Sequence, residues 1–497
     1  MSSQTSPDHE VIVIGAGFSG IGAGIKLDQA GFHDYVILEA GDGVGGAWHW
    51  NTYPGVAVDI PSFSYQFSFE TRADWSRVYA PGNELKAYAE DLVDKYHLRP
   101  KLRFGHRVEK ADFDEEHDLW TLTTTEGKTI TGRYMVGATG VFTDPRKPDI
   151  PGVDDFAGIS MHTARWDHDV DLKGKKVAII GTGASAVQVI PSIAPEVEHL
   201  TVFQRTPIWC MPKPDAPIEG PTKLLLNLPF GKRIARLASQ AYVELTFPIA
   251  ANYAKKLPVG KIGMRQGLQF LESQVKDPET RKKLTPEYGL GCKRPSFHNH
   301  YLKTFNRENV TLETTPIKKI TKTGVSTSDG VSHKIDVLIL ATGFTAFDSD
   351  SLAAVNTAGR GGQDLAEFWD ENRVQAYEGV SVPGFPNMFS ILGPYGYNGA
   401  SYFNLIETQT HHIIRLLKRA REQRATRIEV TREANDRYFA EMMRRRGNQI
   451  FWQDSCALAN SYYFNKDGDV PIRAATTLET MWRAARFDLD DYEFAAA

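Results

Sequence analysis

Residues 11–20 read VIVIGAGFSG, and this stretch decides the fold. Four apolar β-branched residues precede glycines spaced G-x-G-x-x-G, and small and apolar residues follow as far as Leu27. This order favours a strand, a tight turn and a helix. A second copy stands at residues 177–186, which read VAIIGTGASA. The chain therefore carries the strand–turn–helix pattern of a nucleotide-binding unit twice.

The two copies also agree in the segments that come after them. Glu39 and Arg205 each end the next apolar strand, 24 residues after the first glycine of their copy. Each half later returns through an apolar strand that ends in Ala-Thr-Gly, at residues 138–140 and 341–343. We therefore predict an α/β fold with two Rossmann-like dinucleotide-binding domains.

The glycines have a chemical reason. The pyrophosphate of a dinucleotide must approach backbone N–H groups closely, and a Cβ atom would block that approach. The N-terminus of the following helix adds partial positive charge. The predicted nucleotide-binding residues of the turns are Gly15, Gly17 and Gly20 in the first copy, and Gly181, Gly183, Ala184 and Ser185 in the second.

The residue at the end of the next strand distinguishes the two ligands. A carboxylate such as Glu39 accepts hydrogen bonds from free ribose hydroxyls but repels a 2′-phosphate, so we expect FAD in the first unit. Arg205 presents a planar charged fork that suits a 2′-phosphate, and Thr206 adds a hydroxyl donor. We expect NADPH rather than NADH in the second unit, and hence hydride transfer from nicotinamide to flavin.

Prolines and composition divide the chain further. Pro145, Pro148 and Pro151 mark the crossing between the halves. Residues 216–290 mix apolar and basic side chains at helical spacing, which favours a helical insertion that covers an active site or packs on the core rather than touching a membrane. The predicted domains are 1–145 with 385–497 for FAD, 152–215 with 291–345 for NADPH, 216–290 for the insertion and 346–384 for a connecting segment.

Composition excludes several classes of protein. The 497 residues are 41% hydrophobic and 24% charged, which is typical of a folded globular chain. Lys and Arg number 57 against 61 Asp and Glu, so no positive surplus is available for nucleic acid. Residues 1–10 lack a signal-peptide pattern, and no run approaches the roughly 20 apolar residues of a membrane span. We expect a cytoplasmic protein with no integral membrane segment.

The three cysteines, Cys210, Cys292 and Cys456, are an odd number with no close pair in the sequence. We therefore expect neither a disulfide framework nor a CxxC metal or redox site, which fits a reducing cytoplasm. His298 and His300 lack a third ligand, so we expect no metal. Disulfide reductases of similar layout pass electrons to a cysteine pair; without one, molecular oxygen is the simplest acceptor.

Residues 156–167, FAGISMHTARWD, stand between the two units and match the pattern FxGxxxHxxxW(P/D). This pattern resembles the fingerprint of type I Baeyer–Villiger monooxygenases, within the class B flavoprotein monooxygenase family. Related monooxygenases of amines and sulfides carry a pattern that ends in Tyr or Phe. We expect a structural or conformational role for the histidine and tryptophan. The fingerprint residues are Phe156, Gly158, His162, Trp166 and Asp167.

The resemblance implies that ketones are converted to esters or lactones with FAD, NADPH and O2, through a flavin peroxide that attacks the carbonyl. The resemblance also includes Gly46 and Trp48, in the segment that follows the glycine turn at residues 15–20, as cofactor-binding residues. It implies that Arg294 supplies the cation that favours the peroxide and offsets charge on the adduct, with Asp59 as its acidic partner in the cofactor site. Lys293 would add a second cation at the NADPH phosphate.

Two alternatives stay open at this stage. One is a flavin monooxygenase that oxidises sulfides or amines, against which Arg294 and Trp166 argue. The other is a non-catalytic redox sensor that binds both nucleotides and signals to a partner. No oligomeric state is predicted.

Overall fold

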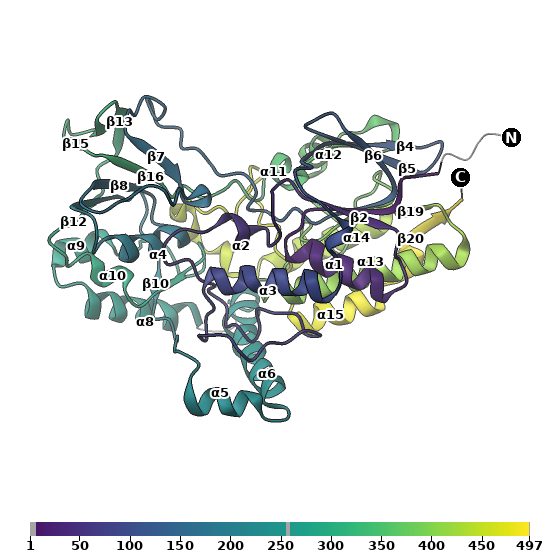
Figure 1. Ribbon diagram of the computed structural model, residues 1–497, viewed down its shortest axis with the longest axis horizontal. Coiled ribbons are helices and arrows are strands. Elements are labelled where there is room, and N and C mark those ends of the chain that lie inside the picture. The colour runs from purple at the N-terminus through teal and green to yellow at the C-terminus, as the bar shows by residue number, and fades with distance from the viewer. Residues whose placement is uncertain (1–5, 255–258, 497) are drawn as a thin grey trace.

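The computed structural model describes residues 6–254 and 259–496. Two lobes form around β-sheets, and helices α5 (Gly220–Asn227) and α6 (Gly231–Glu244) project beneath them (Figure 1). One lobe holds an eight-stranded sheet of order β17-β4-β5-β6-β1-β2-β3, with β18 paired to β6. Its strands are β1 His9–Ile14, β2 Tyr35–Leu38, β3 Leu102–Arg103, β4 Val108–Asp114, β5 Leu119–Thr124, β6 Thr129–Gly137, β17 Asn356–Ala358 and β18 Met388–Ser390.

Strand β1 lies between β2 and β6 and is parallel to both. Val11, Ile12 and Val13 are fully buried, which explains why this strand is apolar on both faces. Strands β4, β5 and β6 pair antiparallel in sequence order. The antiparallel strands therefore begin beyond β6, and β1 and its two neighbours run in one direction. The order of the parallel strands reverses at β1, and the carboxyl end of such a strand is where open α/β sheets bind ligands.

The other lobe repeats this plan in a five-stranded parallel sheet of order β12-β9-β8-β16-β7. Strand β8 takes the place of β1, between β9 and β16. The prediction of two Rossmann-like units in an α/β fold is confirmed. The strands are β7 Ile159–His162, β8 Lys176–Ile180, β9 His199–Phe203, β12 Val310–Glu313 and β16 Val337–Leu340.

Three smaller sheets complete the strands of the described residues. One is a three-stranded antiparallel sheet, and the other two are single strand pairs. They are formed by β13 Ile317–Thr321, β14 Gly324–Thr327 and β15 Ser332–Lys334; by β10 Cys210–Met211 and β11 Ser296–Phe297; and by β19 Arg427–Val430 and β20 Tyr492–Ala495.

Helices α1 and α4 follow β1 and β8 directly, as the sequence pattern predicts, and the long α13 packs against α1. Outside the insertion, the α-helices are α1 Phe18–Gln29, α2 Ala47–Trp50, α3 Gly82–Lys95, α4 Ala184–Ile193, α10 Tyr301–Thr304, α11 Ser349–Ala353, α12 Leu365–Asn372, α13 Tyr402–Gln423, α14 Arg432–Arg446 and α15 Thr477–Arg486.

The segment 216–290 is helical over most of its described residues. After α5 and α6 it contains a π-helix at Leu245–Ile249, then α7 Ala250–Asn252, α8 Val259–Gln274 and α9 Pro278–Lys283. Strand β17 of the larger sheet comes from the predicted connecting segment, and the domain boundaries themselves stay predictions. Across residues 6–254 and 259–496, every helix is too short or too polar to span a bilayer.

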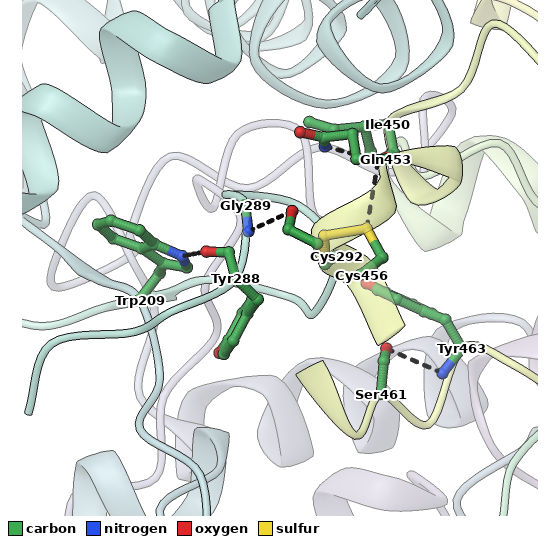
Figure 2. The surroundings of a disulfide bond; sticks show 10 residues. Trp209, Tyr288, Gly289, Cys292, Ile450, Gln453, Cys456, Ser461 and Tyr463 are labelled. Carbon is green, nitrogen blue, oxygen red and sulfur yellow. Dashed lines mark hydrogen bonds between the residues drawn. A yellow bond between two sulfur atoms is a disulfide. The ribbon is translucent and has the colours of Figure 1, made fainter. Parts of the chain in front are cut away.

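The expectation that the cysteines form no pair is wrong. Cys292 and Cys456 form a disulfide with their Cα atoms 4.9 Å apart (Figure 2). Cys210 is free and buried. The two cysteines are separated by 164 residues, so their sequence spacing carried no sign of their contact. The C-terminal segment packs on the loop before Lys293, where Ser455 Oγ accepts a hydrogen bond of 3.0 Å from the N–H of Gly289. The absence of a cysteine pair was the reason for expecting a reducing compartment. Because Cys292 and Cys456 form a disulfide, the cysteines no longer support that expectation.

We predict that Cys456→Ser lowers the free energy of unfolding by about 2–4 kcal/mol in the absence of reductant, because a crosslink over a long loop restricts the unfolded chain. Denaturant titration measures this difference. With reductant present, wild type and variant should unfold alike. Three reactive thiols in unfolded, unreduced wild type, instead of one, would contradict the disulfide.

Candidate active site

A cavity of about 1430 Å³ lies at the carboxyl ends of the central strands of both sheets. Loops after β1, β6, β8 and β16 form its walls, as expected for ligand sites in doubly wound folds. Fourteen of the predicted site residues line it: Gly15, Gly17, Glu39, Gly46, Trp48, Asp59, Gly181, Gly183, Ala184, Ser185, Arg205, Thr206, Lys293 and Arg294.

The first glycine of each turn has the same environment. Gly15 and Gly181 have φ values of +108° and +113°, a region that side chains rarely adopt. A Cβ atom on Gly15 would lie 2.7 Å from the carbonyl oxygen of Ala138, and one on Gly181 would lie 2.4 Å from that of Ala341. The returning Ala-Thr-Gly strands therefore explain why both turns begin with glycine.

The helices after these turns present free N-termini to the cavity. Gly17 is the N-cap of α1 and Gly183 is the N-cap of α4, and neither cap provides a side-chain hydrogen bond. Uncapped N–H groups with a partial positive charge suit a pyrophosphate. Gly20 lies behind the turn instead, since its Cβ would come within 1.8 Å of the Gly15 carbonyl oxygen. Its role here is close helix–strand packing.

Glu39 is held in place at the edge of the cavity. Its Oε2 accepts a hydrogen bond of 2.7 Å from the N–H of Ala16, and its Oε1 accepts one of 2.7 Å from the N–H of Gly41. The side chain is buried. A carboxylate has about four acceptor positions, so these two bonds fix its orientation and still leave capacity for ribose hydroxyl donors.

Arg205 and Lys293 form a cationic region at the other end of the cavity. The pKa of Lys293 lies below its ordinary value because the group is buried and because Arg205 is close. Among the described residues, neither side chain forms an ion pair with a carboxylate. With its amide oxygen turned toward Arg205, Asn460 accepts hydrogen bonds from that guanidinium. Two neighbouring cations without a carboxylate partner suit an anion such as a phosphate.

Arg294 forms a bidentate ion pair with Asp59. The Nε atom lies 2.8 Å from Oδ2, and Nη2 lies 2.9 Å from Oδ1. The side chains are 21% and 31% exposed, and both line the cavity. Burial opposes both charges, but the attraction between the partners prevails, so the pKa of Asp59 is lowered and that of Arg294 is raised well above its ordinary value. Both groups are therefore charged at neutral pH.

Aromatic residues surround this guanidinium. The ring centroid of Phe247, in the π-helix after α6, lies 5.4 Å from Cζ of Arg294. Tyr397 and Tyr463 line the same cavity, and burial raises the pKa of Tyr397 to about 12 even though Arg294 lowers it. The hydroxyl of Tyr397 stays protonated and donates to the carbonyl oxygen of Ala400 over 2.9 Å.

These aromatic residues and Asn460 were not among the residues predicted from the sequence. Phe247 comes from the insertion. The others come from the region beyond residue 390, most of which carries no recognisable motif. Tyrosines at 462 and 463 followed by Phe464 are the sole local signal, an aromatic run close to a cysteine. Nothing in that run shows which residues it contacts.

The predicted fingerprint residues do not line the cavity. Phe156 and Gly158 precede β7, His162 ends it, and Trp166 and Asp167 follow the turn after it. A Cβ atom on Gly158 would lie 2.6 Å from the Asp336 carbonyl oxygen. Burial and then Arg165 lower the pKa of His162 to about 4, and its Nδ1 accepts from the N–H of Ala164. Trp166 packs on the core of the smaller sheet, and Asp167 is exposed. A structural role for these residues stays our prediction.

Comparisons with known proteins identify the family. The family model described as pyridine nucleotide-disulphide oxidoreductase matches residues 12–288. A Baeyer-Villiger monooxygenase of Pseudomonas aeruginosa is 36% identical, covering 92% of this chain and 86% of that protein. One of Streptomyces coelicolor is 35% identical, covering 97% and 92%. The crystal structure of OTEMO in complex with FAD and NADP has a TM-score of 0.88 and 28% identity, covering 99% of this chain and 100% of that chain. On the sequence match over nearly its whole length, this chain belongs to the Baeyer–Villiger monooxygenases.

Proposed function

We propose that this chain is an FAD-containing monooxygenase that uses NADPH and O2 to convert ketones to esters or lactones. The observation that carries the proposal is the Arg294 guanidinium, held by Asp59 in a cavity that both glycine turns also line. Membership of the Baeyer–Villiger monooxygenases supports it, as does the similarity to OTEMO, whose crystal structure is a complex with FAD and NADP.

The residues of the two lobes fit the two cofactors differently. In the larger lobe, the turn at Gly15, the free N-terminus of α1 and the fixed carboxylate of Glu39 suit FAD. In the smaller lobe, the corresponding turn at Gly181 lines the cavity together with the cationic pair Arg205 and Lys293, which suits the 2′-phosphate of NADPH. The main difference between the two sites is the charge that follows the second strand of each unit, which is negative at Glu39 after β2 and positive at Arg205 after β9.

When bound, the cofactors supply the hydride and the oxygen activation. The protein contributes position and charge. Arg294 has five N–H donors, of which the ion pair with Asp59 uses two, and the residue lines the cavity together with Tyr397 and Tyr463. A guanidinium fixed in this way stabilises negative charge that develops on a carbonyl oxygen as the carbonyl is attacked. Asp59 keeps the planar group oriented and offsets the cost of burying it.

The cysteine pair is an unsuitable electron acceptor. Both sulfur-bearing residues are buried, and neither belongs to the described residues that line the cavity. Oxygen and a ketone are therefore the proposed co-substrates. We also propose a cytoplasmic location, on the ground that NADPH is an intracellular reductant.

The Arg294→Ala variant should still allow NADPH to bleach the flavin anaerobically, while ester formation falls by about 100-fold or more, because the fixed cation is removed. Anaerobic stopped-flow absorbance and product mass spectrometry measure the two steps. Arg307→Ala, which removes an exposed guanidinium outside the cavity, is the control and should leave both unchanged. A full ester yield from Arg294→Ala would remove this assignment. If the wild type oxidises sulfides but forms no ester from ketones, the alternative monooxygenase is favoured. If no substrate increases NADPH turnover, the non-catalytic sensor is favoured.

The Arg205→Ala variant should weaken the use of NADPH by about 10- to 100-fold, which corresponds to about 1.5–3 kcal/mol for a charged hydrogen bond. The use of NADH should change little, because NADH has no 2′-phosphate. Steady-state kinetics with both reductants test this, again with Arg307→Ala as the control. An unchanged preference for NADPH over NADH would show that the phosphate binds elsewhere.

The Glu39→Ala variant should retain less FAD, because the ribose loses its acceptor and the N–H groups of Ala16 and Gly41 lose theirs. The ratio of flavin to protein absorbance after gel filtration measures the loss. Glu308→Ala, at an exposed position, is the matched control. Equal flavin content in both variants would contradict the role of Glu39.

A further inference from the structure

Helix α6 meets the protein through both apolar and polar side chains. Val243 is fully buried and Ala235 packs on the core, while Ser239 Oγ donates to Ser64 Oγ over 2.8 Å and Arg236 Nη1 donates to the Gln66 carbonyl oxygen over 2.8 Å. A surface helix normally turns its apolar side toward the core. In α6, several large apolar residues lie on the outer side as well.

The outer side of α6 carries an apolar stripe. Ile234, Leu237 and Leu245 are 67%, 72% and 61% exposed, and with Ala241 they follow one face of the helix at spacings of three and four residues. Helix α5 and the turn after it add Leu224, Leu225, Leu228 and Phe230, each more than half exposed. This segment projects from the molecule (Figure 1).

A second exposed stripe adjoins the first. On α15, Leu478, Met481 and Trp482 are all more than half exposed. The N–H of Thr477 at the start of α15 donates to Glu244 Oε1 at the end of α6 over 3.0 Å, so the two helices meet at these ends. Tryptophan is enriched where proteins enter the interface between lipid and water.

Cations outnumber carboxylates in the projecting segment. Residues 220–243 contain four cations, Lys223, Lys232, Arg233 and Arg236, in a chain whose net charge is -4, and the nearest carboxylates in the sequence are Glu219 and Glu244 at the two ends. Lys223 and Arg233 are exposed beside the apolar residues. An apolar stripe flanked by cations is typical of helices that lie in the surface of an anionic membrane.

We propose that the outer surface of α5, α6 and α15 binds an anionic lipid bilayer, with the apolar stripes in the interfacial layer and no segment crossing the membrane. The charge pattern favours lipid over a second copy of this chain, because a symmetric dimer through this surface would bring cationic segments together without carboxylates from residues 220–243. The protein would then work at a membrane surface, as a peripheral enzyme.

Flotation of the flavin-loaded protein with lipid vesicles tests the proposal. We expect binding to phosphatidylcholine vesicles that contain about 30% phosphatidylserine, and much weaker binding to phosphatidylcholine alone. Binding should fall when salt is raised to roughly 0.5 M, because exposed charges are then screened. Absence of binding to the anionic vesicles at low salt would overturn the proposal.

Two double variants separate the apolar and the ionic contributions. Ile234→Glu with Leu237→Glu should lower the vesicle-bound fraction by about 10-fold or more, while Val331→Glu, at an exposed apolar position of the other lobe, should not. Lys223→Gln with Arg233→Gln should reduce binding and its salt dependence, in contrast to Lys318→Gln with Lys319→Gln.

Flavin content and light scattering accompany each variant, and all four should keep the wild-type flavin ratio. If Ile234→Glu with Leu237→Glu floats like the wild type, the surface does not bind lipid. If that variant instead converts a dimer to a monomer and the wild type does not float, a second copy is the occupant and the proposal is wrong.

Discussion

The ion pair between Asp59 and Arg294 is the constraint on which the site depends. Its partners are 235 residues apart in the sequence, and they join the segment after β2 to the loop before β11. In a fully buried pair, loss of one partner leaves an uncompensated charge that costs about 3–5 kcal/mol, whereas well-packed apolar residues are often as stable as the intact pair. This pair is partly exposed, so stability alone does not explain its charges, and the proposed role of Arg294 as a fixed cation gives a reason for them.

The two nucleotide-binding turns of the site, after β1 and after β8, have the same construction. In both lobes the returning strand carbonyl, of Ala138 or of Ala341, leaves no room for a Cβ atom on the first glycine. Two turns of similar backbone geometry are then followed by different charges, a buried carboxylate at Glu39 and an exposed guanidinium at Arg205. In the function proposed above, the turn supplies two nucleotide sites, and the charge at this one position distinguishes their ligands.

Local patterns could be predicted from the sequence, and long-range contacts could not. The turns at Gly15 and Gly181 are contiguous, so spacing was sufficient to find them. Arg294 and Asp59 were found through family resemblance, because no local pattern connects them. The Cys292–Cys456 disulfide was missed, since it depends on how the C-terminal segment returns. The exposure of Ile234 and Leu237 on α6 was also not predicted, because periodicity reports that a helix is amphipathic and not which of its residues meet the protein.

The disulfide shows how these distant segments are held near the cavity. Cys292, bonded to Cys456 (Figure 2), directly precedes Lys293. Cys456 lies four residues before Asn460, whose amide meets Arg205. The bond thus joins the basic loop to the segment that contacts the other cation. It lies outside the cavity lining, although the matching family model is that of pyridine nucleotide-disulphide oxidoreductases. A crosslink in that place ties together the two segments that carry the cationic region, and we propose that its contribution is positional.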